Sequence, residues 1–277
     1  MNILGISAGF HDAAATVINQ QGDILFAAHS ERYSKIKNDA NISIGLIHEL
    51  ENYNPIDTVA YYERPWAKQL RQLYAGQGIE WSKLRLKSVV HQQIGHGKWQ
   101  DVKHYKNYNH HLSHAAAGFQ TSPFDRATVV VIDAVGEWDT ISIWGAEYDQ
   151  QGRARYKRLW GQYYPHSLGL FYSAITQRVG LHPLDEEYIT MGMSAYGNDN
   201  YHHVMESVLV RDADEIEFGV NLHTGVDENF MSGLDHVDIA ASAQQLLERL
   251  IGNIMRRARD FEWSTNRSEE HTSELQS

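Results

Sequence analysis

Short apolar runs separated by glycine-containing turns predict a three-strand antiparallel meander at the start of the chain. Its strands are expected over residues 2–7, 13–18 and 23–28. The same order of strand, loop, strand, glycine turn and strand returns later, with strands expected over residues 127–133, 140–148 and 153–162. This repetition predicts two related α/β lobes, because a Rossmann sheet would alternate single strands with helices.

Apolar residues recur at helical spacing between and after these strands. Helices are expected over residues 43–53, 66–74, 111–120, 167–179 and 238–261, and single strands over residues 57–62 and 103–109. The pattern weakens over residues 76–103, where we expect a helix and a loop. The first lobe is then expected at residues 1–125 and the second at 126–266, with a cleft between them. The strands that should complete the second sheet are expected beyond residue 266, which would leave one sheet edge without a partner.

Residues 267–277 need a separate interpretation, because they carry no apolar periodicity and follow a helical pattern that has no stop signal. They match, residue by residue, the translation of a common sequencing-library adapter. We interpret this segment as a read-through scar, and the alternative is a genuine polar tail. The natural protein is then expected to continue past residue 266.

Composition excludes several classes of function. The chain has 277 residues, and 24 Lys and Arg against 35 Asp and Glu give a net charge of −11. Nucleic acids and anionic membranes bind basic surfaces, so we expect neither as a partner. The sequence has no cysteine, which excludes disulfides and thiolate chemistry and fits a reducing compartment. No apolar run approaches the roughly 20 residues that span a bilayer, so we expect a cytoplasmic protein.

His110 and His114 are the first candidates for chemistry. On a helix they lie at i and i+4, on one face and about one turn apart, which suits a shared divalent metal. Position 111 holds histidine where the zincin pattern has glutamate, so metalloprotease chemistry is disfavoured. Asp133, at the end of a buried strand, would complete a set of two histidines and one carboxylate, which suits Fe²⁺ or a similar ion. The alternative is a group of capping or core histidines.

Glycine-containing loops supply further candidates. Gly136 and Glu137 follow Asp133 and could hold a cation or contact a phosphate through backbone amides, whereas the alternative is a simple hairpin. The glycines at 95–97 lack the spacing and the Ser or Thr of a Walker motif, so this segment is discarded.

The equivalent loop of the first lobe contains Gly9, His11 and Asp12. The glycine lets backbone approach an anion, and a histidine beside a carboxylate offers a base. Residues 31–37, which include Lys37, form a basic cluster that is a candidate for binding an anion. The alternative interpretation of this cluster is a solvated loop.

A series of motifs occurs in a fixed order along the chain. It comprises GISAGFHDAAA at 5–15, ER at 31–32 with Lys35 and Lys37, HHLSHA at 110–115, IDAVGE at 132–137, SLGLFYS at 167–173, EYITMGMSAYG at 187–197 and DIAASAQ at 238–244. Together, over residues 2–245, these motifs resemble the O-carbamoyltransferases of nodulation-factor and antibiotic biosynthesis.

The resemblance implies a two-lobed α/β fold of the actin, sugar-kinase and Hsp70 type, similar to the tRNA threonylcarbamoyl transferase, followed by a C-terminal YrdC-like domain. It also implies that carbamoyl phosphate and ATP form carbamoyl-adenylate in the YrdC-like domain. The carbamoyl group would then move to the hydroxyl of a small-molecule acceptor at a metal-bearing cleft.

Carried over residue by residue, the resemblance implies that His110, His114 and Asp133 are iron ligands and that a fourth ligand lies beyond residue 266. His11 and Asp12 match the catalytic pair of the cleft. The candidates for binding the substrate or the adenylate are Gly9, Lys37, Gly136 and Glu137. The chain departs from the family pattern at Ser30, Ala134 and Ile189, where Glu, Gly and Lys are usual.

Three alternatives remain at this point. A tRNA threonylcarbamoyl transferase shares the histidine spacing, but the acidic charge, the His11–Asp12 pair and the 31–37 segment disfavour it. A sugar kinase has no role for the histidine pair. A non-catalytic nucleotide-binding module would be expected if the chain acted without a further domain. Separately, we expect residues 1–277 alone to be poorly folded and inactive in carbamoyl transfer.

Overall fold

The structure is a computed structural model that describes residues 1–95, 99, 102–264 and 267–271. The chain forms two compact units, Met1–Ser113 and His114–Ser277. We expected the boundary at residues 125 and 126, and the structure places it inside helix α5 (His110–Gln120). The reason is that Phe119, near the end of this helix, packs on Tyr148 and Tyr156 of the second unit, with ring centroids 5.0 and 5.9 Å apart.

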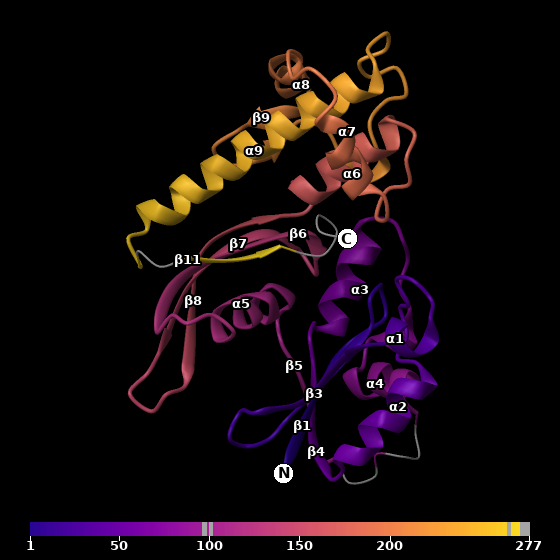
Figure 1. Cartoon of the computed structure of the whole chain (residues 1–277), viewed down its shortest axis with the longest axis vertical. Helices are drawn as coiled ribbons and strands as arrows, with labels where there is room; N and C mark the ends of the chain where they lie inside the picture. The colour runs from indigo at the N-terminus through magenta and orange to yellow at the C-terminus, as the bar shows by residue number, and fades with distance from the viewer. Residues whose placement is uncertain (96–98, 100–101, 265–266, 272–277) are drawn as a thin grey trace. The chain divides into compact units, whose positions relative to one another are not determined.

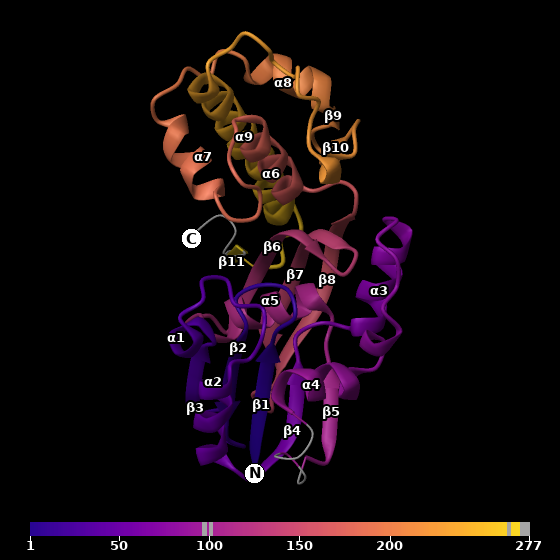
Figure 2. The ribbon, with the colours of Figure 1, turned by 90° about the vertical axis from the view of Figure 1, so that its right-hand side faces the viewer.

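The first unit is built on a five-stranded sheet of order β3-β2-β1-β4-β5 (Figure 2). Its strands are β1 (Asn2–Ser7), β2 (Ala14–Ile18), β3 (Ile24–His29), β4 (Ile56–Tyr61) and β5 (His104–Asn107). The first three form the expected antiparallel meander, and β4 and β5 run parallel to β1. Alternate residues such as Leu4, Val17 and Val59 are fully buried, as the period of two requires.

Helices complete the first unit. They are α1 (Glu31–Ser34), α2 (Ile44–Leu50) with the 3₁₀ turn η1 (Glu51–Tyr53), α3 (Pro65–Tyr74), η2 (Trp81–Lys83) and α4 (Leu86–Ile94). Ser43 caps α2 by accepting the Leu46 amide at 3.3 Å, and this helix buries Leu46 and Leu50 against the sheet. The weak pattern over 76–103 thus contains α4, and part of its expected loop, residues 96–98 and 100–101, lies outside the described residues.

The second unit contains a sheet of order β11-β6-β7-β8. Its meander consists of β6 (Arg126–Gly136), β7 (Asp139–Tyr148) and β8 (Ala154–Tyr163). Helix α5 lies on one face of these strands and helices α6 (Leu168–Arg178) and α9 (His236–Asp260) on the other (Figure 1). Burial on both faces explains why β6 reads as a continuous β-branched run rather than an alternation. The expected α/β fold with a repeated meander is therefore confirmed.

The edge of β6 is paired in the structure, where we expected it to lack a partner. The backbone of residues 267–271 forms β11 (Arg267–His271), which runs parallel to β6 from Thr128 to Ile132. An open strand edge offers unpaired N–H and C=O groups that accept a further strand through main-chain bonds, largely independent of its side chains. Residues 272–277, the rest of the segment that we interpret as a read-through scar, lie outside the described residues.

The rest of the second unit holds elements that the apolar pattern did not predict. These are α7 (Glu187–Ser194), α8 (His202–Leu209), β9 (Val210–Asp212), β10 (Glu217–Phe218) and the turn η3 (Leu222–Thr224). Within the described part of the chain, no helix combines the length and the apolar character needed to cross a membrane.

Candidate metal centre

Helix α5 carries two histidines one turn apart. Asn109 precedes the helix, and its Oδ1 accepts the Leu112 backbone amide at 2.9 Å, which satisfies one of the free N–H groups of the first turn. The alanines at 115–117 favour the helical state. The helical period then places the side chains of His110 and His114 on the same face.

Asp133 lies near the end of β6, where the strand departs from regular pairing. The ladder pairs Ile132 with Ile141 and then Gly136 with Asp139, so three residues of β6 face a single residue of β7. A bulge of this kind bends the strand and turns a side chain away from its regular direction. The Asp133 residue is 6% exposed.

The first turn of α6 holds the bulge in place. The hydroxyl of Ser167 donates to the Ala134 carbonyl at 2.7 Å, lies 3.3 Å from the Asp133 carbonyl, and accepts the Leu170 amide at 3.1 Å as the helix N-cap. Gly169 lies so close that an added Cβ would be 2.6 Å from the Ala134 Cα. The backbone that carries Asp133 is therefore fixed by α6 as well as by its own strand.

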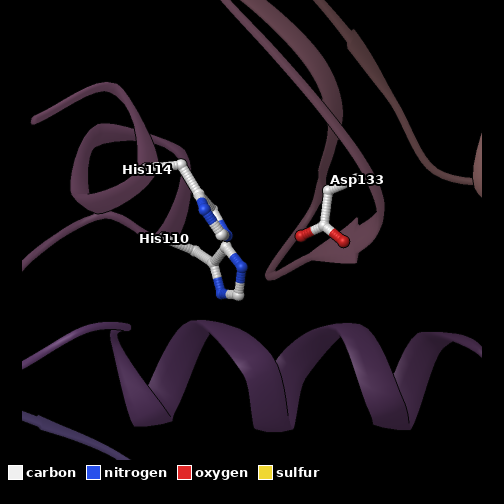
Figure 3. Close-up of side chains that lie close together, drawn as sticks. All are labelled: His110, His114 and Asp133. Carbon is white, nitrogen blue, oxygen red and sulfur yellow. The ribbon is translucent and has the colours of Figure 1, made fainter. Parts of the chain in front are cut away.

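The structure brings the three expected metal ligands together. One ligand atom each of His110, His114 and Asp133 lies within 4.8 Å of the other two (Figure 3). Ligands about 2.1 Å from an ion are roughly 3–4 Å from one another, so a small side-chain movement would close this group around a cation. Two imidazoles and one carboxylate form the donor set of non-haem Fe²⁺ sites and leave positions open for substrate. The residues present fit a divalent ion.

A buried carboxylate lies behind one of the histidines. Glu63 is 4% exposed, and its Oε2 is 3.6 Å from Nδ1 of His110, while its Oε1 accepts from Nζ of Lys68 at 2.9 Å. Burial alone would raise the pKa of the Glu63 carboxyl, but its interactions with His110 and Lys68 outweigh burial and hold this pKa below its ordinary value. Sequence reasoning missed Glu63, because it directly precedes a helix start and has no motif around it.

The β1–β2 loop carries the expected base. Nδ1 of His11 is 2.8 Å from Oδ2 of Asp12, and both side chains are partly exposed. Gly9 has a φ of 93° and Asp12 a φ of 48°, both in the left-handed region. The Gly9 amide donates to the Ala40 carbonyl at 2.7 Å, which ties the loop to the segment that follows Lys37. Lys37 itself is exposed.

The turn between β6 and β7 holds the remaining candidates. Gly136 and Glu137 are both buried, and Glu137 has a φ of 59°. Asp139, which follows them, is paired with Arg158 of β8 at 2.6 Å. The Asp139 side chain is 5% exposed and that of Arg158 is 29% exposed, so this ion pair is partly buried and ties the turn to β8. Sequence reasoning missed the pair because its two partners lie on different strands.

A family model decides the family of the chain. The model for the carbamoyltransferase N-terminus matches residues 41–262. The chain belongs to the carbamoyltransferase family. The match includes His110, His114, Asp133 and the turn at 136–137, and it begins after the loop of His11 and Asp12. The family expected from the sequence motifs is confirmed.

Curated relatives are considerably longer than this carbamoyltransferase chain. An uncharacterized protein, sll1178, of Synechocystis is 35% identical over an alignment of 223 residues, and the match covers 72% of this chain and 35% of that protein. The nodulation protein NolNO of Sinorhizobium fredii is 24% identical over an alignment of 270 residues, and the match covers 89% of this chain and 38% of that protein. The chain thus spans well under half the length of these relatives.

Solved structures provide more distant similarities. The activator of 2-hydroxyisocaproyl-CoA dehydratase from Clostridium difficile has a TM-score of 0.45 at 10% identity, covering 99% of this chain and 81% of that chain. A ROK family glucokinase from Streptomyces griseus has a TM-score of 0.39 at 14% identity, covering 95% and 80%.

Proposed function

We propose that this chain provides the carbamoyl-transfer centre of an enzyme that moves a carbamoyl group onto a hydroxyl of a small-molecule acceptor. The observation that carries the proposal is the meeting of His110, His114 and Asp133 in a chain of the carbamoyltransferase family. These three residues would hold a divalent cation, with Fe²⁺ as our first choice. When bound, the ion supplies Lewis-acid stabilisation of negative charge that develops on the carbamoyl or phosphate oxygens.

His11 is proposed as the general base. With Asp12 accepting a hydrogen bond from Nδ1, the imidazole keeps a lone pair on Nε2. That nitrogen would take the proton of the acceptor hydroxyl while its oxygen attacks the carbamoyl carbon. The bond from this carbon to the adenylate oxygen then breaks, and AMP leaves. Asp12 stabilises the imidazolium that results, as the third member of a catalytic triad does.

Backbone and basic groups are proposed to hold the anionic part of the donor. Gly9, with its positive φ, and the turn of Gly136 and Glu137 offer amide groups for a phosphate, and Lys37 offers a positive charge. The donor, carbamoyl-adenylate, is proposed to form from carbamoyl phosphate and ATP in a separate YrdC-like domain. The curated relatives are longer than this chain, which leaves room in them for a further domain. We expect the reaction to take place in the cytoplasm.

The two half-reactions provide the test. In the full-length enzyme, His114→Ala is expected to remove most carbamoyl transfer while ATP/pyrophosphate exchange with carbamoyl phosphate continues, because exchange reports adenylate formation alone. His203→Ala, an exposed histidine on a helix of the same unit, is the matched control and should affect neither activity. Equal loss of exchange and transfer in His114→Ala would contradict the proposal.

A further inference from the structure

The end of β4 and the residue that follows it contact both the β1–β2 loop, which carries His11, and helix α5. The hydroxyl of Tyr61 donates to the Ala8 carbonyl at 2.5 Å, at the start of the loop that carries His11. The carbonyl of the next residue, Tyr62, accepts from the Ser113 hydroxyl of α5 at 2.7 Å. Its ring meets the imidazole of His110 edge-on, with centroids 5.2 Å apart. Glu63 comes next in the sequence and faces the same imidazole.

Glu63 is a buried carboxylate with one lysine partner. Its side chain is 6% exposed, and that of its partner Lys68 is 17% exposed. A buried carboxylate is costly unless it is paired, and Lys68 compensates only one of its two oxygens, at 2.9 Å. The second oxygen, Oε2, is directed at Nδ1 of His110, whose side chain is 12% exposed, at 3.6 Å.

We propose that Glu63 is a positioning residue that holds His110 in the Nδ1–H tautomer and so presents its Nε2 lone pair to the metal. This inference rests on the metal centre of the proposed function. A neutral imidazole has one N–H and one lone pair, and an ionised carboxylate can only accept, so the nitrogen that faces it carries the proton. Figure 3 shows one ring nitrogen of His110 turned toward Asp133 and the other turned away. A carboxylate behind a ligating histidine also fixes the ring and raises its basicity.

The competing explanation is that Glu63 and Lys68 form an ion pair that only stabilises the fold. The two explanations differ in what Lys68 does. If the pair is structural, loss of either partner has the same consequence. If Glu63 positions His110, loss of Lys68 leaves the carboxylate facing Nδ1 and keeps the metal site intact.

Metal titration separates the two explanations. Co²⁺, which reports its binding through visible absorption, is titrated into the full-length protein that contains this chain and into its variants, with circular dichroism to verify folding. Glu63→Gln is expected to weaken Co²⁺ binding roughly 10–100-fold, the range found when carboxylates behind ligating histidines are removed. Lys68→Met should stay within about threefold of the unchanged chain. Equal affinities of Glu63→Gln and the unchanged chain, or equal weakening in both variants, would overturn the proposal.

Glu80→Gln is the matched control for this titration. Glu80 is also paired with a lysine, Lys83, at 2.9 Å in the same unit, but its side chain is 58% exposed. Its replacement removes the same charge and the same kind of ion pair, so it should leave the Co²⁺ affinity unchanged. A weakening equal to that of Glu63→Gln would mean that the loss is a general charge effect, and would overturn the proposal.

A second measurement needs no variant of Glu63 to fold. Long-range ¹H–¹⁵N spectra of the histidine-labelled, metal-free full-length protein at about pH 8 distinguish the Nδ1–H tautomer from the Nε2–H tautomer by the pattern of ring couplings. The signal of His110 is assigned by its absence in His110→Gln. We expect the Nδ1–H tautomer, and an Nε2–H tautomer would overturn the inference. If the protein without substitutions binds no Co²⁺, the proposed metal centre is contradicted. The tautomer of His110 still tests the role of Glu63 independently of that result.

Discussion

Replacing Gly169 with alanine should disturb Asp133 without touching a ligand. A Cβ at this position would lie 2.6 Å from the Ala134 Cα and 2.9 Å from the Ala134 nitrogen. Ordinary contact begins at 3.4 Å, so α6 and β6 must separate by about 0.8 Å. The neighbour is backbone and cannot rotate away. The shift therefore falls on the bulge that carries Asp133 and on the hydrogen bonds of Ser167.

The expected size follows from two opposing terms. Overpacking of this kind costs about 1–3 kcal/mol. Alanine in place of a helical glycine recovers roughly 0.5–1 kcal/mol. The net destabilisation of Gly169→Ala is then about 0–2.5 kcal/mol with a midpoint of about 1 kcal/mol, which corresponds to a fall of up to roughly 10 °C in melting temperature. Because ligands must be placed within a fraction of an ångström, we also expect Co²⁺ affinity to fall about tenfold, which corresponds to about 1.4 kcal/mol.

Urea unfolding and Co²⁺ titration of the same preparations measure both effects. Gly252→Ala is the matched control, since this glycine lies in α9 and an added Cβ would meet only Nη1 of Arg256, at 3.7 Å. It should be more stable than the unchanged chain by roughly 0.5–1 kcal/mol and bind Co²⁺ equally well. A Gly169→Ala variant that is as stable as Gly252→Ala and binds Co²⁺ normally would refute the packing argument.

Two further predictions concern the same unit. Ser167→Ala should lower the free energy of unfolding by about 1 kcal/mol through loss of the N-cap and also weaken Co²⁺ binding, whereas Ser43→Ala, which removes the cap of α2, should lower stability without changing Co²⁺ affinity. The backbone amide of Arg153 and the side chain of Arg155 hold the pKa of Asp149 at about 2, against 3.8 ordinarily. Since the pKa of Asp149 is lower in the folded state, this stabilisation is present above about pH 4 and is lost as the pH falls toward 2. Asp149→Asn should therefore flatten the dependence of the unfolding free energy on pH in this range. An NMR titration that gives Asp149 an ordinary pKa would contradict this prediction.

Local patterns were sufficient to predict much of the fold. The meander strands depend on short apolar runs, and α5 depends on a helical period that directly fixes His110 relative to His114. The elements that sequence reasoning missed include α7 and α8, which have only 8 residues each, about two helical turns over which an apolar period can be read. The boundary between the units also differed, because the aromatic packing of Phe119 is a tertiary contact that no local pattern encodes.

Glu63 shows where prediction from the sequence ends. It lies two residues after the end of β4 and well before His110 in the chain, and the residues that follow it read as an ordinary helix start with proline. Only the folded unit shows that its carboxylate is buried and directed at an imidazole. A buried acidic residue can be recognised from burial and partners, which a single sequence does not contain.

The position of Asp133 shows how a local prediction can name the right residue for an incomplete reason. The sequence predicts a strand ending at residue 133 and a glycine turn, whereas β6 continues to Gly136 through a bulge. In a regular strand, the direction of Asp133 would follow from alternation alone. In the bulge, its carbonyl and that of Ala134 leave the regular ladder, and the Ser167 hydroxyl lies within 3.3 and 2.7 Å of them. The direction of the carboxylate therefore depends on α6, so substitutions at 167 and 169 should act on the metal centre although neither residue supplies a ligand.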